Sequence, residues 1–342
     1  MFFRARRSNL CAGLLAAVSC IPLHAQDKQV ELRFAHWLPA SHALAKLSLE
    51  PWAKSVEAAS QGSIKVVFYP AQQLGKAADH YDMSRDGVAD MAWVSPGYQA
   101  GRFPIFAASE LPLLISNASR GSQAVDLWYR KYAPTEMKDV HYCLAHIHVG
   151  SLHTKKAVSK PSEIKGMKVR PSNGTIAQTM TLLGATNVQV SAVEARDALD
   201  KGVADALTYP WTSLITFGMD KAVKFHTDIP IYAGSFVWTM NKRWYEKLST
   251  TQKKVIDTHC TNDWALKAGA PYADFEDEGR VQLEKAAGHT VIRLSQPDVD
   301  AWKKAVEPIS AKWLEDAAKA GIDGRGALDS LKRELASRNA LY

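Results

Sequence analysis

Short apolar runs alternate with amphipathic segments along the first hundred residues of the chain. Partial alternation of apolar and polar residues predicts strands over 30–37 and 63–69, and residues 91–94 form a third, short apolar strand. Apolar residues at helical spacing predict a helix over 44–59, with Pro51 marking a kink or a restart inside it. A second helix is expected between the second and third strands. This order of elements favours an α/β sheet with helices on its faces.

The remaining chain continues the mixture of strands and helices. We expect helices over 121–132, 250–285, 299–320 and 326–336, and strands over 140–149, 222–229, 235–240 and 290–294. This pattern predicts an α/β fold of two lobes with a hinge, each lobe a sheet flanked by helices, and a long helix spanning the lobes. The expected lobes are 26–148 with 236–278, and 149–235 with 279–342.

The segment 166–210 contains the strongest candidate for a binding residue. Residues 167–170 predict a short strand that ends on Arg170, and Ser172 or Asn173 can cap the helix that follows. An arginine fork beside a helix N-terminus suits a carboxylate, because both supply N–H donors. The alternative interpretation is an exposed arginine in an ion pair.

Two other strand ends carry candidates for a ligand cleft. Trp37 follows the first strand, and Ser95 and Tyr98 follow the third. Ligands of open α/β sheets bind outside the carboxyl ends of strands, so these residues are candidates for one wall of a cleft. Ordinary packing in the core is the alternative explanation for the two aromatic residues.

Seven sequence blocks in a consistent order resemble one known family. The blocks are GMKVR at 166–170, LGA at 183–185, GVAD at 202–205, YPAQQLG at 69–75, GVAD at 87–90, ELPL at 110–113 and MNKRW at 240–244. This pattern resembles the periplasmic substrate-binding proteins of TRAP transporters (tripartite ATP-independent periplasmic transporters), the C4-dicarboxylate-binding type. The resemblance covers residues 34–248.

The resemblance implies a two-lobe periplasmic binding protein that closes on an organic acid and delivers it to the membrane subunits of a TRAP transporter. It places the family's carboxylate-binding arginine on Arg170. A second arginine that many members carry would fall near Gly150 and is absent, and Tyr209 stands where many members have asparagine. A bulky aromatic residue of the family corresponds to about Ala192. These departures favour a monocarboxylate, such as an aromatic, hydroxy or oxo acid, over a C4-dicarboxylate.

The predicted ligand-binding residues share positions at strand ends or aromatic character near them. They are Arg170, Tyr209, Trp37, Ser95, Tyr98, Asn173, Trp211, Trp238 and His148. The resemblance leaves open a cation that bridges a carboxylate to the protein. His146 and His148 would share one face of a strand, with His141 and His153 close by, but no carboxylate or thiolate lies at ligand spacing. We therefore predict no metal and no other cofactor.

The N-terminus and the charge indicate an exported protein that does not bind nucleic acid. Residues 1–25 resemble a secretory signal peptide, with three arginines followed by an apolar stretch too short to span a membrane. Cleavage before a lipidated Cys20 is the alternative. The formal charge is +7 and falls to +4 after removal of these three arginines, and no basic run is present. We expect a soluble monomer in the periplasm.

The sequence contains two cysteines beyond the predicted signal peptide and none of the common catalytic motifs. Cys143 and Cys260 remain after export; an oxidising compartment permits a disulfide, but we expect two buried free thiols. No nucleophile elbow, HExxH motif, Walker loop or GxGxxG motif occurs. We therefore expect a binding protein and not an enzyme. A secreted hydrolase acting on a small acid, and a sensor that docks on a receptor kinase, are the alternatives.

Overall fold

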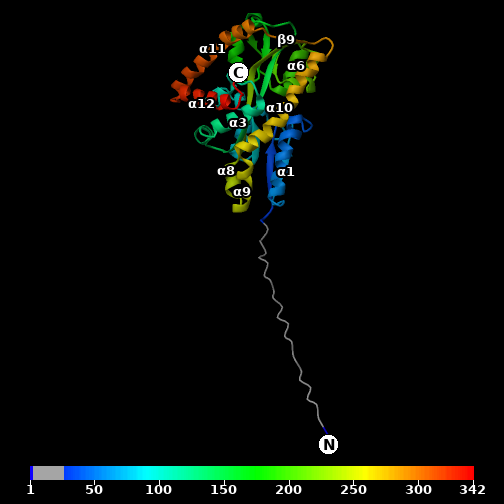
Figure 1. Cartoon of the computed structure of the whole chain (residues 1–342), viewed down its shortest axis with the longest axis vertical. Helices are drawn as coiled ribbons and strands as arrows, with labels where there is room; N and C mark the ends of the chain where they lie inside the picture. Colours follow the sequence, from blue (N-terminus) through cyan, green and yellow to red (C-terminus); the bar gives the residue numbers. More distant parts are fainter. Residues whose placement is uncertain (3–26) are drawn as a thin grey trace.

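The structure is a computed structural model, and it describes residues 1–2 and 27–342. Apart from its first two residues, the predicted signal peptide lies outside the described residues. Among the described helices, none is both long and apolar enough to cross a membrane. The chain folds into an elongated α/β structure in which helices flank a twisted sheet (Figure 1).

The strands in the described residues form one hydrogen-bonded sheet. They are β1 (Val30–Ala35), β2 (Ile64–Tyr69), β3 (Met91–Val94), β4 (His141–Thr154), β5 (Lys168–Arg170), β6 (Thr186–Asn187), β7 (Ala206–Tyr209), β8 (Phe225–Met240) and β9 (Thr290–Arg293). The order across the sheet is β2-β1-β3-β8-β4-β7-β5-β6, and β9 pairs with β8. The pairs β1–β2, β1–β3, β5–β6 and β5–β7 are parallel, whereas β4 and β8 run antiparallel to each other. The predicted α/β fold is confirmed.

Two long strands connect the halves of this sheet and correct the strand prediction. The strand predicted over 140–149 continues to Thr154, and the two strands predicted over 222–229 and 235–240 are one strand, β8. The pairing of β4 with β8 shifts register between Gly150 and Leu152, so the ladder bends without ending. Such irregularities leave the apolar character of a strand intact, and sequence alone therefore does not show where two runs join.

The helices cover both ends of the sheet. They are α1 (Glu50–Ala59), α2 (His80–Asp86), α3 (Ala118–Tyr129), α4 (Ala133–Glu136), α5 (Gly174–Leu182), α6 (Ala195–Asp200), α7 (Trp211–Thr216), α8 (Lys242–Glu246), α9 (Thr250–His259), α10 (Asn262–Lys285), α11 (Gln296–Lys319) and α12 (Gly324–Ser337). Figure 1 shows α1, α8 and α9 at one end, α6 and β9 at the other, and α10 running between them. A five-residue π-helix (Ala45–Leu49) precedes α1, so Pro51 marks a restart in the first turn of α1.

The long helix α10 packs on elements from both ends of the molecule. It contacts α3 and β4, and it also contacts α7 and β9. A Cβ atom at Gly279 would lie only about 2.3–2.5 Å from backbone atoms of Trp211 and Thr212, so only glycine permits this close approach to α7. The helical stretch predicted over 250–285 is divided, because α9 ends before Cys260 and Thr261 caps α10.

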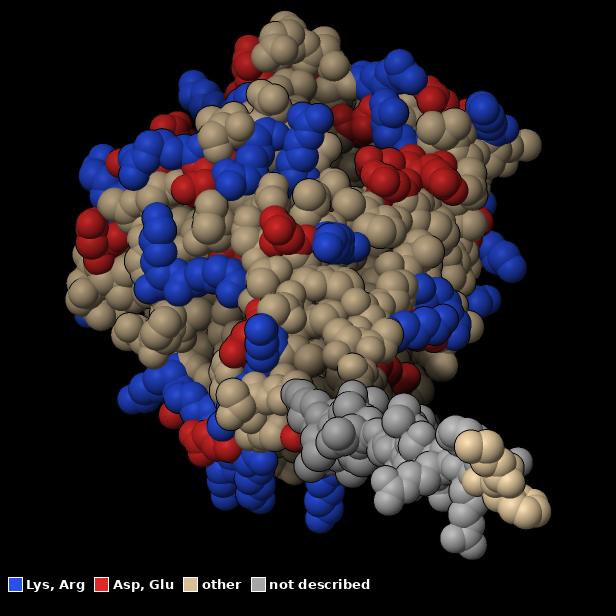
Figure 2. Space-filling model, turned by 60° about the horizontal axis from the view of Figure 1, so that its bottom comes forward, with Lys and Arg blue, Asp and Glu red and all other residues tan. Residues whose placement is uncertain are grey.

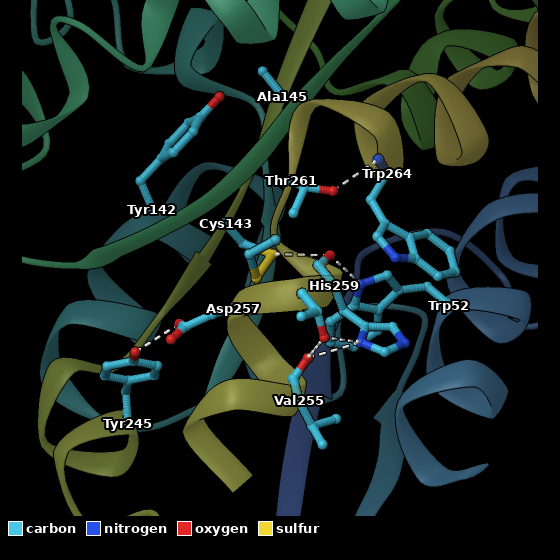
Figure 3. The surroundings of a disulfide bond; sticks show 12 residues. Trp52, Tyr142, Cys143, Ala145, Tyr245, Val255, Asp257, His259, Thr261 and Trp264 are labelled. Atoms are coloured by element: carbon cyan, nitrogen blue, oxygen red, sulfur yellow. Dashed lines mark hydrogen bonds between the residues drawn. A yellow bond between two sulfur atoms is a disulfide. The ribbon is translucent and has the colours of Figure 1, made fainter. Parts of the chain in front are cut away.

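Cys143 on β4 and Cys260 between α9 and α10 form a disulfide (Figure 3). The prediction of two free thiols is therefore wrong. The two residues are 117 positions apart, and packing of α9 against its neighbours brings them together: Trp52 donates a hydrogen bond to the carbonyl of His259 at 2.8 Å. No local sequence pattern reports a contact of this separation.

A buried carboxylate beside the disulfide ties three elements together. Asp126 on α3 has no solvent exposure. Its Oδ2 accepts hydrogen bonds from Arg130 Nε at 2.7 Å and Asn262 Nδ2 at 2.9 Å. Its Oδ1 accepts from Tyr142 Oη at 2.8 Å and the backbone N–H of Ala145 at 2.9 Å. The charge is neutralised within the protein, and α3, β4 and α10 are joined through it.

The face of the protein shown in Figure 2 carries charges of both signs. Lysine and arginine side chains are interspersed there with aspartate and glutamate, and no continuous basic stripe forms on this face. The whole chain has 42 lysine and arginine residues and 35 acidic residues, a formal net charge of +7. This face therefore lacks the basic footprint of a nucleic-acid interface.

Candidate functional site

A cavity lies where four strand ends meet. Trp37 and Ser95 follow β1 and β3, Arg170 ends β5, and Tyr209 ends β7; all four residues line the cavity. The cavity encloses ≈ 520 Å³ of space not filled by protein atoms, part of it open to solvent. The carboxyl ends of β1 and β3, from one half of the sheet, meet those of β5 and β7, from the other half, at this cavity. This is the expected position of a ligand crevice in an α/β sheet.

Arg170 is buried at one end of the cavity without a carboxylate partner. Its side chain is 2% exposed, and no described carboxylate lies within ion-pair distance. Nε donates to the carbonyl of Val190 at 3.1 Å and Nη2 donates to Tyr98 Oη at 3.3 Å. Hydrogen bonds from the N–H and Oγ of Ser191 to Oε2 of Glu194 lower the pKa of Glu194, and the charge of Arg170 contributes less. Since guanidinium has five N–H donors, most of them remain for another group.

Further donors surround Arg170. Tyr98 Oη accepts from Arg170 and from the N–H of Ala192 at 3.2 Å, so its own proton is left to donate. Ser172 Oγ is buried and has no hydrogen-bond partner in the described chain. Of the two residues predicted to cap α5, Asn173 is the cap, because its Oδ1 accepts from Ile176 N at 2.9 Å. Together these groups form a cradle of donors suited to an anion.

Aromatic rings form two walls that extend from Arg170. Along one wall, Arg170 lies 5.7 Å from the ring centre of Tyr209, whose ring contacts Phe217 at 6.0 Å between centroids. Along the other wall, Tyr98 contacts Trp37 at 5.8 Å, and Trp37 contacts Phe236 at 6.5 Å. All of these rings line the cavity. A flat apolar group in the cavity would therefore contact aromatic rings.

Two buried histidines lie at the other end of these walls. His42 contacts Phe217 with centroids 5.4 Å apart, and His148 contacts Phe236 at 4.7 Å. Tyr272 contacts both imidazoles, at 5.8 Å for His42 and 4.4 Å for His148. Burial lowers the pKa of His42 to about 4 and lowers the pKa of His148 well below its usual value. Both imidazoles are therefore neutral at pH 7.

Glu110 adds a carboxyl group to the cavity wall. It is 2% exposed, and its Oε1 has no hydrogen-bond partner. Burial raises the pKa of Glu110 to about 8, and the backbone of Ser235 and the amide of Asn173 offset this only in part. The protonated form predominates at pH 7. Arg170 is then the charged side chain among the described residues that line the cavity.

Most of the predicted site residues line the cavity, and two do not. Those that line it are Arg170, Tyr209, Trp37, Ser95, Tyr98, Asn173 and His148. Trp238 lies farther along β8, where it packs edge to face against Phe34 and Trp52 in the core, with centroids 5.5 and 5.6 Å away. Trp211 begins α7 and packs against His153 at 5.1 Å. Neither Trp211 nor Trp238 lines this cavity.

Several residues of the cavity were not predicted from the sequence. They are His42, Glu110, Phe217, Tyr232, Phe236 and Tyr272. Tyr232 and Phe236 share one face of β8 with Gly234 between them, a period-two pattern visible once 225–240 is treated as one strand. Glu110 begins one of the family-like blocks. Tyr272 lies on α10, and the sequence offers no local signal that α10 reaches the cavity.

The geometry around Gly150 explains why a second arginine is absent there. A Cβ atom at Gly150 would lie 2.2 Å from the ring of Tyr232 and 2.5 Å from the carbonyl oxygen of Tyr209. No side chain fits in this space. Tyr232 is paired with Gly150 across β4 and β8 and takes the volume that a longer residue would need.

His153, one of the four histidines considered for a metal, belongs to a hydrogen-bonded chain of histidines and does not line the cavity. Its Nε2 lies 3.0 Å from the carbonyl oxygen of Tyr209, and its Nδ1 lies 2.9 Å from Nδ1 of His226. His226 Nε2 lies 3.0 Å from His289 Nδ1. The carbonyl of Tyr209 can only accept, so Nε2 of His153 carries the proton and Nδ1 of a neutral His153 accepts from His226. By the same reasoning, Nε2 of a neutral His226 accepts from Nδ1 of His289. In the described chain, no group of three or more histidine, cysteine or acidic residues has the geometry of a metal site.

Comparison with known proteins identifies the family. Residues 34–316 match the family of bacterial extracellular solute-binding proteins, family 7. The chain belongs to this family. The resemblance to TRAP solute-binding proteins that the sequence blocks indicated is therefore confirmed, and the solute-binding proteins of this family are receptors.

Three solved TRAP solute-binding proteins illustrate the similarity. One from Rhodoferax ferrireducens, in complex with copurified benzoate, is 28% identical with a TM-score of 0.86, covering 91% of this chain and 99% of that one. One from an unidentified marine microbe, specific for aromatic acids and crystallised with 3-hydroxybenzoate, is 33% identical with a TM-score of 0.86 and the same coverage. One from Bordetella bronchiseptica, with bound mandelate, is 27% identical with a TM-score of 0.84, covering 90% and 99%.

Proposed function

We propose that this protein is an exported receptor for an aromatic monocarboxylic acid, which it delivers to the membrane components of a TRAP transporter. The observation that carries the proposal is Arg170, a buried cation without a carboxylate partner at one end of a cavity walled by aromatic rings. The carboxylate of the ligand would supply the missing charge and accept the free guanidinium donors. The ligands of the three solved relatives are aromatic acids and support this class.

The charge balance of the cavity favours one carboxylate over two. Arg170 offers one positive charge, Glu110 is protonated at pH 7, and both histidines are neutral. A second carboxylate would be buried without a cation, which is strongly unfavourable. A C4-dicarboxylate is therefore the less suitable ligand. The protein acts in this proposal as a periplasmic receptor without catalytic activity.

The proposed lobes meet at a hinge formed by β4 and β8. The predicted lobe boundaries, 148/149 and 235/236, lie opposite each other in the sheet, since His148 pairs with Gly234 and Ile147 pairs with Ser235. Lobe I would comprise 26–148 and 236–278, and lobe II 149–235 and 279–342. Closing the two lobes would exclude water from the cavity and strengthen the bond between Arg170 and a carboxylate.

Titration calorimetry with benzoate tests the proposed function. Wild-type protein should bind benzoate, and Arg170→Ala should lower the affinity more than about a hundredfold, on the order of 3 kcal/mol. Arg170→Lys should not restore the affinity, because a point charge does not reproduce the two-point contact. A folded Arg170→Ala protein that binds benzoate within about threefold of wild type would contradict the proposal.

A further inference from the structure

Two further side chains that line the cavity contain buried polar atoms without a hydrogen-bond partner in the described chain. Nε2 of His148 and Nε1 of Trp37 are buried and have no hydrogen-bond partner in the described chain. Their side chains are 5% and 3% exposed, and His42 beside them is 4% exposed. All three line the cavity. Unpaired polar atoms at this depth are costly unless something else bonds to them.

We propose that His42 and His148 form a second recognition site that binds an uncharged hydroxyl group of the ligand. This inference rests on the proposed function and narrows the ligand to a hydroxylated aromatic monocarboxylate. The carboxylate would lie at Arg170, the ring between the aromatic walls, and the hydroxyl at the two histidines.

The hydrogen bond of His42 fixes which nitrogen is a donor. Its Nδ1 accepts from the backbone N–H of Leu44 at 3.2 Å, so in the neutral ring the proton is on Nε2. His42 therefore presents a donor. A neutral His148 has one nitrogen that accepts and one that donates. A hydroxyl group can accept from His42 and donate to His148 at once, whereas a carbonyl or carboxylate oxygen can only accept.

The environment of the two imidazoles excludes a charged group at this end. Phe217 covers His42, Phe236 covers His148, and Tyr272 contacts both rings. The hydroxyl of Tyr272 is already bonded to Ser213 Oγ at 2.7 Å. No lysine or arginine other than Arg170 lines the cavity in the described chain. A second carboxylate here would have no cation, and protonating either buried histidine to supply one is unfavourable.

The aromatic walls determine where the hydroxyl must lie on the ligand. On each wall, the ring contacts lead from Arg170 through aromatic side chains to a histidine: Tyr209 and Phe217 to His42, and Tyr98, Trp37 and Phe236 to His148. A hydroxyl adjacent to the carboxylate would stay at the Arg170 end. We therefore expect the histidines to bond to a hydroxyl on the part of the ring away from the carboxylate.

Calorimetry at pH 7 with five acids tests the inference. The ligands are benzoate, 3-hydroxybenzoate, 4-hydroxybenzoate, isophthalate and terephthalate. We expect at least one hydroxybenzoate to bind wild-type protein about tenfold tighter than benzoate, because it satisfies buried polar atoms. The dicarboxylate with its second carboxylate at the same ring position should bind at least about tenfold more weakly than that hydroxybenzoate.

Variants of His42 separate its donor from its structural contact. In His42→Asn, the amide oxygen can replace Nδ1 and accept from Leu44, but no donor remains at the position of Nε2. The affinity ratio of hydroxybenzoate to benzoate should fall to about twofold or less. The matched control is His141→Asn, since His141 stacks on Tyr245 outside the cavity, and it should keep the wild-type ratio.

The outcomes distinguish the inference from the proposed function. If benzoate binding depends on Arg170 but neither hydroxybenzoate binds tighter than benzoate, the inference is wrong and the proposed function stands. An unchanged ratio in folded His42→Asn, or tighter binding of a dicarboxylate, also overturns the inference. If none of the five acids binds, both are wrong. The comparison of ligands on wild-type protein decides the matter even if His42→Asn does not fold.

Discussion

Two buried ions of this protein differ in how their charge is neutralised. Asp126 is 0% exposed and accepts hydrogen bonds from an arginine, a tyrosine, an asparagine and a backbone N–H. Arg170 is 2% exposed and bonds only to a carbonyl and a hydroxyl, both uncharged. A buried charge without a counter-ion is expensive, so such a residue indicates a partner that comes from outside the chain.

The two regions also differ in position. The Asp126 network joins α3, β4 and α10 close to the disulfide, and Arg130 completes it by donating to the carbonyl of Cys143 at 2.8 Å. Arg170 lies at the end of a strand, where side chains from different elements surround a cavity. We interpret the first region as a fixed part of the scaffold and the second as the part that a ligand completes.

The largest effect is expected from breaking the Asp126 network. Asp126→Ala leaves Tyr142 Oη, Asn262 Nδ2 and the N–H of Ala145 without this acceptor. It also removes the counter-ion of the partly exposed Arg130, which keeps its bond to the carbonyl of Cys143. The free energy of unfolding should fall by about 3–5 kcal/mol, as measured by denaturant titration. Benzoate affinity of the folded fraction should stay close to wild type. A loss of less than about 1 kcal/mol would show that the network is not the structural element that we describe.

Removal of the disulfide should destabilise the same region by a smaller amount. The double variant Cys143→Ser with Cys260→Ser frees a loop with a sequence separation of 117 residues. The expected loss is about 2–4 kcal/mol of unfolding free energy, measured by thermal and denaturant unfolding against wild type. Adding a reductant to the double variant should change nothing further, because no disulfide remains in the described part of the chain. Equal stability of variant and wild type would contradict this prediction.

Patterns of local sequence predicted the α/β fold and the strand that carries Arg170. Alternation and helical spacing depend on neighbouring residues, so strands such as β1, β2 and β3 were recognised almost to the residue. The position of Arg170 between a strand and a capped helix also follows from adjacent residues. The absence of a counter-ion, which makes Arg170 informative, is visible only in three dimensions.

Features that join distant segments were not predictable in the same way. The disulfide links residues on β4 and after α9, and Tyr272 reaches the cavity from α10. Trp238 and Phe236 lie two residues apart on the same face of β8, yet one belongs to the core and the other to the cavity. Periodicity assigns a side chain to a face of a strand, but packing decides what that face meets.

Replacing Arg170 should change the stability of the protein with the opposite sign to replacing Asp126. Arg170→Met replaces the unpartnered cation by an apolar side chain of comparable length. Without ligand, the variant should be more stable than wild type by about 1–3 kcal/mol, because a buried uncompensated charge is removed. The sign is opposite to that expected for Asp126→Ala. A variant that is clearly less stable than wild type without ligand would mean that Arg170 is neutralised within the protein after all.

The smallest expected effect concerns the pH dependence that Glu110 introduces at the same cavity. Burial raises its pKa to about 8, so the folded protein holds a proton that the unfolded chain releases near the usual pKa of a glutamate. The contribution of Glu110 to stability therefore falls as the pH rises toward 8 and stays constant above it. An ionised Glu110 would also repel the carboxylate of a ligand.

Benzoate affinity of wild-type protein should accordingly be constant between pH 6 and pH 7 and fall by about fivefold between pH 7 and pH 9. The cavity histidines do not contribute in this range, since the pKa of His42 is about 4 and that of His148 is lowered as well. Glu110→Gln removes the titrating group, and its affinity should not change between pH 7 and pH 9. A decrease of the same size in Glu110→Gln would assign the titration to a different residue. If the benzoate affinity of wild-type protein does not decrease up to pH 9, the pKa of Glu110 lies above 9 and this prediction is wrong.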